Sequence, residues 1–154
     1  MILSNWQRIL TATDFSPLGN QAVEYAHGLA EELRAELHVL HIARDVSDVA
    51  LKHGPTGVLD PATVEEGQAW LNEVLGESRT IRRVDAIQVG HNVAEKISHY
   101  AQTNGIQLIV MATHGRTGLA HFWTGSIAED VVRSAPCPVL VIRPSADQNK
   151  KPAV

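Results

Sequence analysis

The sequence contains a single cysteine, Cys137, among its 154 residues. One thiol cannot form an internal disulfide, and there is no second cysteine from which a zinc site or a redox motif could be built. The sequence also lacks a run of about eighteen apolar residues, which a membrane-spanning helix would need, and its first residues lack the pattern of a signal peptide. These absences favour a cytoplasmic location and no membrane partner.

Basic residues are scarce as well. Lys and Arg number 13 against 17 Asp and Glu, so the net charge is −4 at pH 7. Proteins that bind nucleic acids depend on a basic surface, and we therefore expect no nucleic acid as a partner. An anionic ligand would have to be held by local groups such as backbone N–H donors.

The remaining composition is that of an ordinary globular protein. Hydrophobic residues make up 44% of the chain and charged residues 19%, which argues against disorder and against coiled coils. We expect one domain over residues 1–145, followed by a polar tail at 146–154.

Short apolar runs alternate with longer stretches of helical periodicity, a pattern typical of βαβ units and a parallel sheet. The five expected strands are Arg8–Ala12, Glu36–Ile42, Val84–Val89, Leu108–Met111 and Val139–Ile142. Most are rich in Val, Ile and Leu, as strands covered on both faces should be.

Four helices are expected between these strands, and each opens at a capping residue. The caps and the residues that follow them are Ser16 with Pro17, Asp60 with Pro61, Asn92 with Glu95, and Ser126 with Glu129. The apolar positions are Ala22, Ala26, Leu29, Ala30 and Leu33 in the first helix, Val64, Leu71 and Leu75 in the second, Ile97, Tyr100 and Ala101 in the third, and Ile127, Val131 and Val132 in the fourth. Gly76 and Asn104-Gly105 are expected to end the second and third helices.

The segment Arg44–Leu59 is longer than usual for a strand-to-helix loop and is either mobile or functional.

A glycine-rich stretch follows the fourth strand and leads into the last helix. It contains Gly115 and Gly118, and later Gly125-Ser126 at the helix start. Glycines let backbone N–H groups approach an oxyanion, and a helix N-terminus favours negative charge, so this stretch fits a phosphate-binding loop. The alternative is that the glycines make turns and Ser126 caps the helix. Neither the P-loop nor the G-x-G-x-x-G pattern is present.

Asp14 follows the first strand, at the edge of the sheet where open parallel sheets bind their ligands. It could accept hydrogen bonds from a base amino group or from a ribose hydroxyl. It could equally cap the first helix from just before Ser16.

The histidines do not predict a metal site. His38 and His41 are three residues apart in one strand and so point to opposite faces of the sheet. We expect His41 to be half-buried and satisfied by backbone, and His114 to be a loop residue near the ligand.

Taken together, these motifs resemble the universal stress protein family. The resemblance runs from about Trp6 to Arg143 and rests on Thr13-Asp14-Phe15-Ser16, His41-Ile42, Thr113-His114-Gly115-Arg116-Thr117-Gly118, Gly125-Ser126 and Ala135-Pro136-Cys137-Pro138-Val139-Leu140-Val141-Ile142. The ATP-binding branch of that family has the pattern Gly-x2-Gly-x9-Gly-Ser/Thr. Here Gly115, Gly125 and Ser126 match, whereas Ala112 takes the place of the first glycine.

The resemblance implies a nucleotide site. Asp14 and the backbone of Ile42 and Met111 would hold adenine, Ala12 and Ala112 would border the ribose, and Gly115, Gly125 and Ser126 would hold phosphates, with Arg116 as a further candidate. The candidate site comprises Ala12, Thr13, Asp14, Ile42, Met111, Ala112, His114, Gly115, Arg116, Gly118, Gly125 and Ser126.

We therefore expect an α/β fold: a doubly wound, Rossmann-like, five-stranded parallel sheet in the order 3-2-1-4-5. The expected ligand is ATP, with or without Mg²⁺, acting as a regulatory ligand with at most slow hydrolysis, since no catalytic group is evident.

A homodimer is expected through Val139–Ile142, because an apolar sheet edge tends to pair. One alternative is a nucleotide-free dimeric interaction module, favoured if Ala112 or Trp123 blocks the site. A phosphoacceptor domain built on Asp14 is disfavoured, because Arg143 stands where a lysine is needed.

Overall fold

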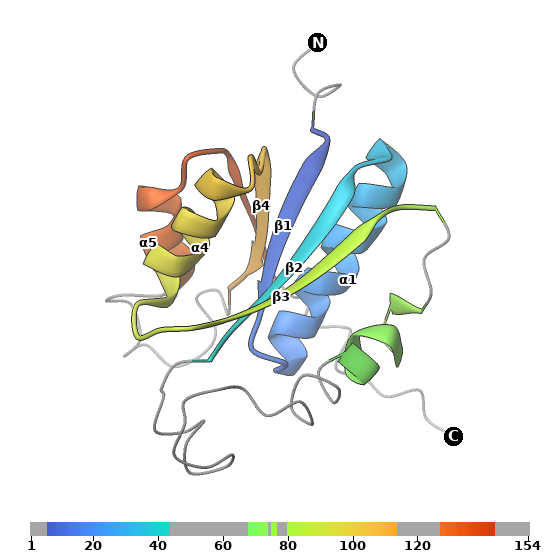
Figure 1. Ribbon diagram of the computed structural model, residues 1–154, viewed down its shortest axis with the longest axis horizontal. Coiled ribbons are helices and arrows are strands. Elements are labelled where there is room, and N and C mark those ends of the chain that lie inside the picture. Colours follow the sequence, from blue (N-terminus) through green and yellow to red (C-terminus); the bar gives the residue numbers. More distant parts are fainter. Residues whose placement is uncertain (1–5, 44–67, 74, 77–79, 114–126, 144–154) are drawn as a thin grey trace.

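The computed structural model describes residues 6–43, 68–73, 75–76, 80–113 and 127–143 (Figure 1). Its centre is a five-stranded sheet in the order β3-β2-β1-β4-β5, in which all neighbouring strands are parallel. The strands are β1 (Arg8–Thr13), β2 (Glu36–Ala43), β3 (Arg83–Val89), β4 (Leu108–Ala112) and β5 (Val139–Ile142). The predicted fold class and strand order are confirmed.

Helices cover both faces of this sheet. On one face lie α1 (Pro17–Leu33) and a short helical stretch at 68–73, and on the other lie α4 (Val93–Thr103) and α5 (Ile127–Ser134) (Figure 1). The central strand β1 is therefore buried on both sides. Ile9 packs into the cluster beneath α1, whereas its neighbour Leu10 packs into the cluster beneath α4 and α5, and both are fully buried. This alternation follows from the two-residue period of a strand.

The helix caps form where the sequence predicts them in the described residues. Ser16 Oγ accepts a hydrogen bond from the Gly19 N–H at 3.1 Å, and Asn92 Oδ1 accepts one from the Glu95 N–H at 3.1 Å. Gly105, just past the end of α4, has a φ of 62°, which suits glycine. The caps expected at Asp60 and Ser126, the segment Arg44–Leu59 and the tail at 146–154 lie outside the described residues.

One expected apolar position is not in the core. In α5, Ala128 and Val131 are buried, whereas Val132 is 53% exposed. Val132 follows Val131 by one residue and so lies about 100° further round the helix, away from the sheet.

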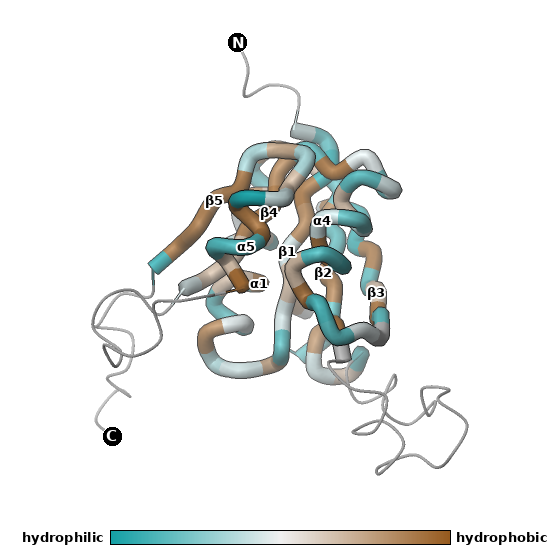
Figure 2. The backbone as a smooth tube through the Cα atoms, turned by 90° about the vertical axis from the view of Figure 1, so that its left-hand side faces the viewer, coloured by the Kyte–Doolittle hydropathy of each residue, from teal (hydrophilic) through white to brown (hydrophobic). Residues whose placement is uncertain are grey.

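The two edges of the sheet differ in chemistry. β5 is apolar along its length (Figure 2), and Val141 on it is 36% exposed. The opposite edge, β3, carries Arg83 and Asp85, which form an ion pair with Nε and Oδ1 3.0 Å apart. No helix in the described part of the chain is long and apolar enough to cross a membrane.

Candidate functional site

A cavity of about 260 Å³ opens at the carboxyl ends of β1 and β4. This is where the chain order of the strands reverses, with β2 on one side of β1 and β4 on the other, and ligands of open parallel sheets bind at such points. The volume is close to the lower end of the roughly 300–1,000 Å³ of small-molecule sites. Its lining residues are Ala12, Thr13, Asp14, Ser16, Leu18, Gly19, Ile42, Val93, Ile97, Met111, Ala112, Thr113, Ile127 and Ala128.

Half of the candidate site residues named from the sequence line this cavity together: Ala12, Thr13, Asp14, Ile42, Met111 and Ala112. They come from three neighbouring strands, β1, β2 and β4, and from the residue after β1. The other six, His114, Gly115, Arg116, Gly118, Gly125 and Ser126, lie outside the described residues.

Several lining residues were not predicted from the sequence to belong to the site. Val93 and Ile97 of α4 and Ile127 of α5 form an apolar wall, and Leu18 and Gly19 contribute from the first turn of α1. Ile97 was expected only as a core residue, and its helical periodicity does not reveal that it borders a cavity. Only the packing of α4 against the end of the sheet does so.

The turn after β1 is built from short side chains that bond to nearby backbone. Thr13 Oγ1 accepts from the Phe15 N–H at 3.0 Å, and Asp14 Oδ1 accepts from the Ser16 N–H at 3.0 Å. Such bonds stabilise tight turns in place of a ladder or a helix. Between them, Phe15 has a φ of 62°, a left-handed conformation that bulky residues rarely adopt.

Asp14 takes one of the two roles that the sequence left open for it, at the start of α1, and it also borders the cavity. Its carboxylate accepts the Ser16 N–H and so helps to form the start of α1. The side chain is also exposed and lines the cavity. A carboxylate has about four acceptor positions, so it can accept more than one hydrogen bond.

Gly19 allows α1 to approach this turn closely. A Cβ atom at position 19 would lie 2.8 Å from Asp14 Oδ1 and 2.9 Å from Thr13 Oγ1. Both distances are shorter than real Cβ contacts. The absence of a side chain at this position therefore leaves room for the Asp14 carboxylate where it lies.

Ala112 occupies its position without strain. It is the last residue of β4 and pairs with Ile142 of β5. Among the described non-glycine residues, positive φ values occur at Phe15 and Arg34, not at Ala112. The backbone at this point therefore does not require the conformational freedom of a glycine.

His41 is half-buried, and its Nδ1 lies 2.9 Å from the carbonyl oxygen of Thr13, which confirms that backbone satisfies it. His38 points to the other face of the sheet, where its ring nitrogens contact Tyr100 and Glu36. In the part of the chain that the structure describes, no group of three or more His, Cys, Asp or Glu side chains could hold a metal ion.

The described lining of the cavity combines an apolar wall with one ionisable side chain. Asp14 is the only ionisable residue among the described lining residues. A flat, mostly apolar ring that donates a hydrogen bond to a carboxylate fits such a site, because the ring surface meets aliphatic side chains and the donor meets an anion.

The chain is similar to known proteins over most of its length. The sequence model of the universal stress protein family matches residues 5–143. Universal stress protein MJ0531 of Methanocaldococcus jannaschii is 32% identical over 142 residues, which make up 90% of this chain and 82% of that protein. The solved structure of MJ0577 from the same organism superposes with a TM-score of 0.69 at 26% identity, covering 92% of this chain and 99% of that one. A universal stress protein of Archaeoglobus fulgidus, solved in complex with dAMP, superposes with a TM-score of 0.61 at 18% identity, covering 92% and 99%.

Proposed function

This chain belongs to the universal stress protein family, and we propose that it binds ATP in the cavity at the carboxyl ends of β1 and β4. The observation that carries the proposal is the gathering of six candidate residues from β1, its following turn, β2 and β4 around one cavity, with Asp14 as its single ionisable group among the described residues. Adenine presents a flat ring and an amino group, which match the apolar wall and the carboxylate.

In the proposed complex, Asp14 accepts a hydrogen bond from adenine, and the backbone at Ile42 and Met111 borders the base. The ribose lies near Ala12 and Ala112, with Thr13 beside it. The Archaeoglobus fulgidus relative supports adenine as the base, because its dAMP is an adenine nucleotide held on the same fold.

We propose that the phosphates lie at Gly115, Gly125 and Ser126, with His114, Arg116 and Gly118 nearby. The position of α5 supports this arrangement, because its first residues, Ile127 and Ala128, line the cavity. The N–H groups at the start of a helix favour an anion that lies close to them. Mg²⁺ could accompany the phosphates as their counter-ion.

The nucleotide is proposed to act as a regulatory ligand in the cytoplasm, with at most slow hydrolysis. A single carboxylate among the described lining residues gives no pair of acidic groups for a catalytic metal ion or for acid–base chemistry. A regulatory ligand needs only a different affinity for two states of the protein. The reducing cytoplasm suits a chain with one cysteine.

Self-association through β5 is the second part of the proposal. β5 is a sheet edge and carries the exposed Val141, and a two-fold contact between copies would cover it. The alternative function is a dimeric interaction module that binds no nucleotide. The exposed β5 edge favours this alternative if the cavity does not bind ATP.

Calorimetry of ATP and adenosine tests the nucleotide site. We expect the wild type to bind both. Asp14→Asn, which keeps an acceptor for the Ser16 N–H but loses the charge, should weaken both by roughly tenfold or more, since a charge-assisted hydrogen bond contributes about 1.5–3 kcal/mol. Gly125→Val should weaken the binding of ATP far more than the binding of adenosine, because a side chain at position 125 would block backbone contacts to phosphate.

Two controls complete the experiment. Circular dichroism checks that each variant is folded, and the mass of any small molecule released on denaturing the purified protein shows whether a nucleotide was already bound. A folded wild type that binds neither ATP nor adenosine, and releases no nucleotide, would overturn the proposal.

A further inference from the structure

His41 lies beside the proposed adenine site but outside its cavity. Thr13 and His41 are paired in the register of β1 and β2, and Nδ1 of His41 lies 2.9 Å from the Thr13 carbonyl oxygen. A carbonyl can only accept a hydrogen bond, so Nδ1 must carry the proton and donate it. The imidazole therefore holds the last carbonyl of β1, one residue before Asp14.

The same ring also supports the residue that follows Asp14. The centroids of the Phe15 and His41 rings are 4.5 Å apart, and the Phe15 and Trp70 ring centroids are 5.1 Å apart in an edge-on arrangement. These distances are typical of favourable aromatic contacts. Phe15 has a φ of 62°, a conformation that costs free energy and needs support from its surroundings. His41 thus contacts the residue before Asp14 and the residue after it.

His41 cannot reach the cavity itself. Its neighbours Leu40 and Ile42 belong to the core cluster beneath α4 and α5, where the cavity lies, whereas Leu37 and Val39 belong to the cluster beneath α1. Because successive side chains of a strand alternate between faces, His41 lies on the α1 side. Any effect on a ligand must pass through the Thr13–Phe15 turn.

We propose that His41 is a positioning residue of the nucleotide site, which fixes the Thr13–Phe15 turn so that the Asp14 carboxylate faces the base. This inference rests on the proposed binding of ATP. Without the Nδ1–H donor, the turn populates other conformations, and the apparent dissociation constant rises in inverse proportion to the fraction of protein that stays competent to bind. ATP and adenosine should be affected by the same factor, because both present the same base to Asp14.

The sharpest test compares His41→Asn with His41→Gln. The amide nitrogen of Asn lies near the position of Nδ1, whereas that of Gln lies nearer the position of Nε2, so only Asn is placed to donate to the Thr13 carbonyl. We expect His41→Gln and His41→Leu to raise the dissociation constants of ATP and adenosine roughly fivefold to thirtyfold, the range for a loss of about one to two kcal/mol on removing one partly buried hydrogen bond. His41→Asn should stay close to the wild type. His99→Leu, on the exposed side of α4, is the matched control and should leave binding unchanged.

A second measurement needs no nucleotide. Long-range ¹⁵N–¹H correlation spectra of the ligand-free wild type should show His41 as the Nδ1–H tautomer. The Nε2–H tautomer would overturn the inference, as would a folded His41→Gln variant that binds ATP as tightly as His41→Asn. If the wild type binds neither ATP nor adenosine, the proposed function fails and this role fails with it. If the wild type binds and His41→Gln binds equally well, only the role of His41 fails.

Discussion

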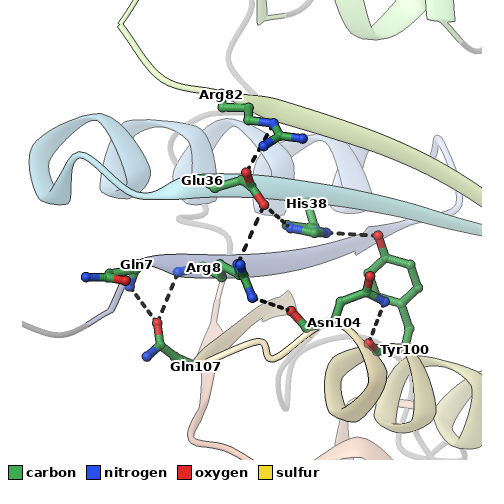
Figure 3. A network of polar contacts seen from close by, with 8 residues as sticks. All are labelled: Gln7, Arg8, Glu36, His38, Arg82, Tyr100, Asn104 and Gln107. Carbon is green, nitrogen blue, oxygen red and sulfur yellow. Dashed lines mark hydrogen bonds and ion pairs between the residues drawn. The ribbon is translucent and has the colours of Figure 1, made fainter.

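The phenolic oxygen of Tyr100 lies 2.9 Å from Nδ1 of His38, and this contact joins α4 to β2 (Figure 3). Nε2 of the same ring lies 2.8 Å from Oε1 of Glu36. With a neutral imidazole, Tyr100 donates to Nδ1 while Nε2–H donates to the carboxylate, so every group in the chain of contacts is satisfied. Arg82 and Arg8 flank Glu36, with N–O distances of 3.2 Å and 3.8 Å. Buried polar networks that are fully satisfied fix one arrangement of the elements they join.

Tyr100→Phe should destabilise the protein by about 1–3 kcal/mol, because it leaves the buried Nδ1 of His38 without its donor. The free energy of unfolding in urea measures this change. Tyr25→Phe is the matched control: Tyr25 is 51% exposed on α1, and its replacement should change stability by less than about 0.5 kcal/mol. Equal stability of the Tyr100 variant and the wild type would show that the contact contributes nothing.

The same residue predicts a loss of stability in alkali. Burial, and secondly the negative charge of Glu36, raise the pKa of Tyr100 above its usual value of 10.0. The unfolded chain therefore releases this proton at a lower pH than the folded one. The contribution of Tyr100 to the free energy of unfolding is therefore complete below pH 10.0. It is lost as the pH rises through the higher pKa of the folded state.

Unfolding free energies of the wild type and Tyr100→Phe should therefore converge at alkaline pH. The half-buried Cys137, whose thiol pKa is raised by burial, is present in both proteins and cancels in the difference. A stability difference that stays constant from about pH 8 to about pH 11 would contradict the assignment.

Gly19→Ala should disturb the nucleotide site more than the fold. The added methyl would lie 2.8 Å from Asp14 Oδ1, so the carboxylate has to move. We expect ATP affinity to fall by about tenfold, which corresponds to about 1.4 kcal/mol. Gly28→Ala is the control within the same helix: nothing lies within 4 Å of its added Cβ, and it should stabilise the protein by about 0.5–1 kcal/mol without affecting ATP. Calorimetry measures the ATP affinity of both variants, and urea unfolding measures their stability. Unchanged ATP affinity in a folded Gly19→Ala protein would count against the site.

Val141→Lys should convert the proposed dimer to a monomer. A charge on an edge strand opposes pairing with a second copy, because the ammonium group would have to lose water. Val132→Lys is the control, since Val132 is 53% exposed on α5, away from the edge strand. Sedimentation at micromolar concentration distinguishes the species. A monomeric wild type, or a Val141→Lys protein that stays dimeric, would rule out this interface.

The sequence predicted the sheet closely because its central strands, β1, β2 and β4, are mostly buried and therefore apolar. No predicted strand end differs from the observed one by more than one residue: β1, for example, ends at Thr13 and not at Ala12. The caps at Ser16 and Asn92 were equally visible, since the bonds they make depend only on neighbouring residues. His41 was expected to be half-buried and satisfied by backbone, and its contact with the Thr13 carbonyl confirms this.

Contacts between distant elements could not be predicted in the same way. Tyr100 was expected to face inward and His38 to face away from His41, but their meeting depends on how α4 lies across β2. Gly19 carried no distinguishing signal, since Gly28 lies in the same helix and has nothing within 4 Å of an added Cβ. The left-handed Phe15 carried none, since phenylalanine rarely adopts that conformation.

The unlike edges of the sheet also limit how far copies of the chain can add to one another. β5 presents Val141 to its surroundings, whereas β3 carries the Arg83–Asp85 ion pair. Growth into a fibre requires that each added copy offer a fresh edge that accepts the next one. Pairing of β5 with β5 would use the apolar edge of both copies and leave β3, which carries the Arg83–Asp85 ion pair, at the two ends of the joined sheet. The proposed dimer would close at two chains, so raising the protein concentration should populate it without seeding filaments.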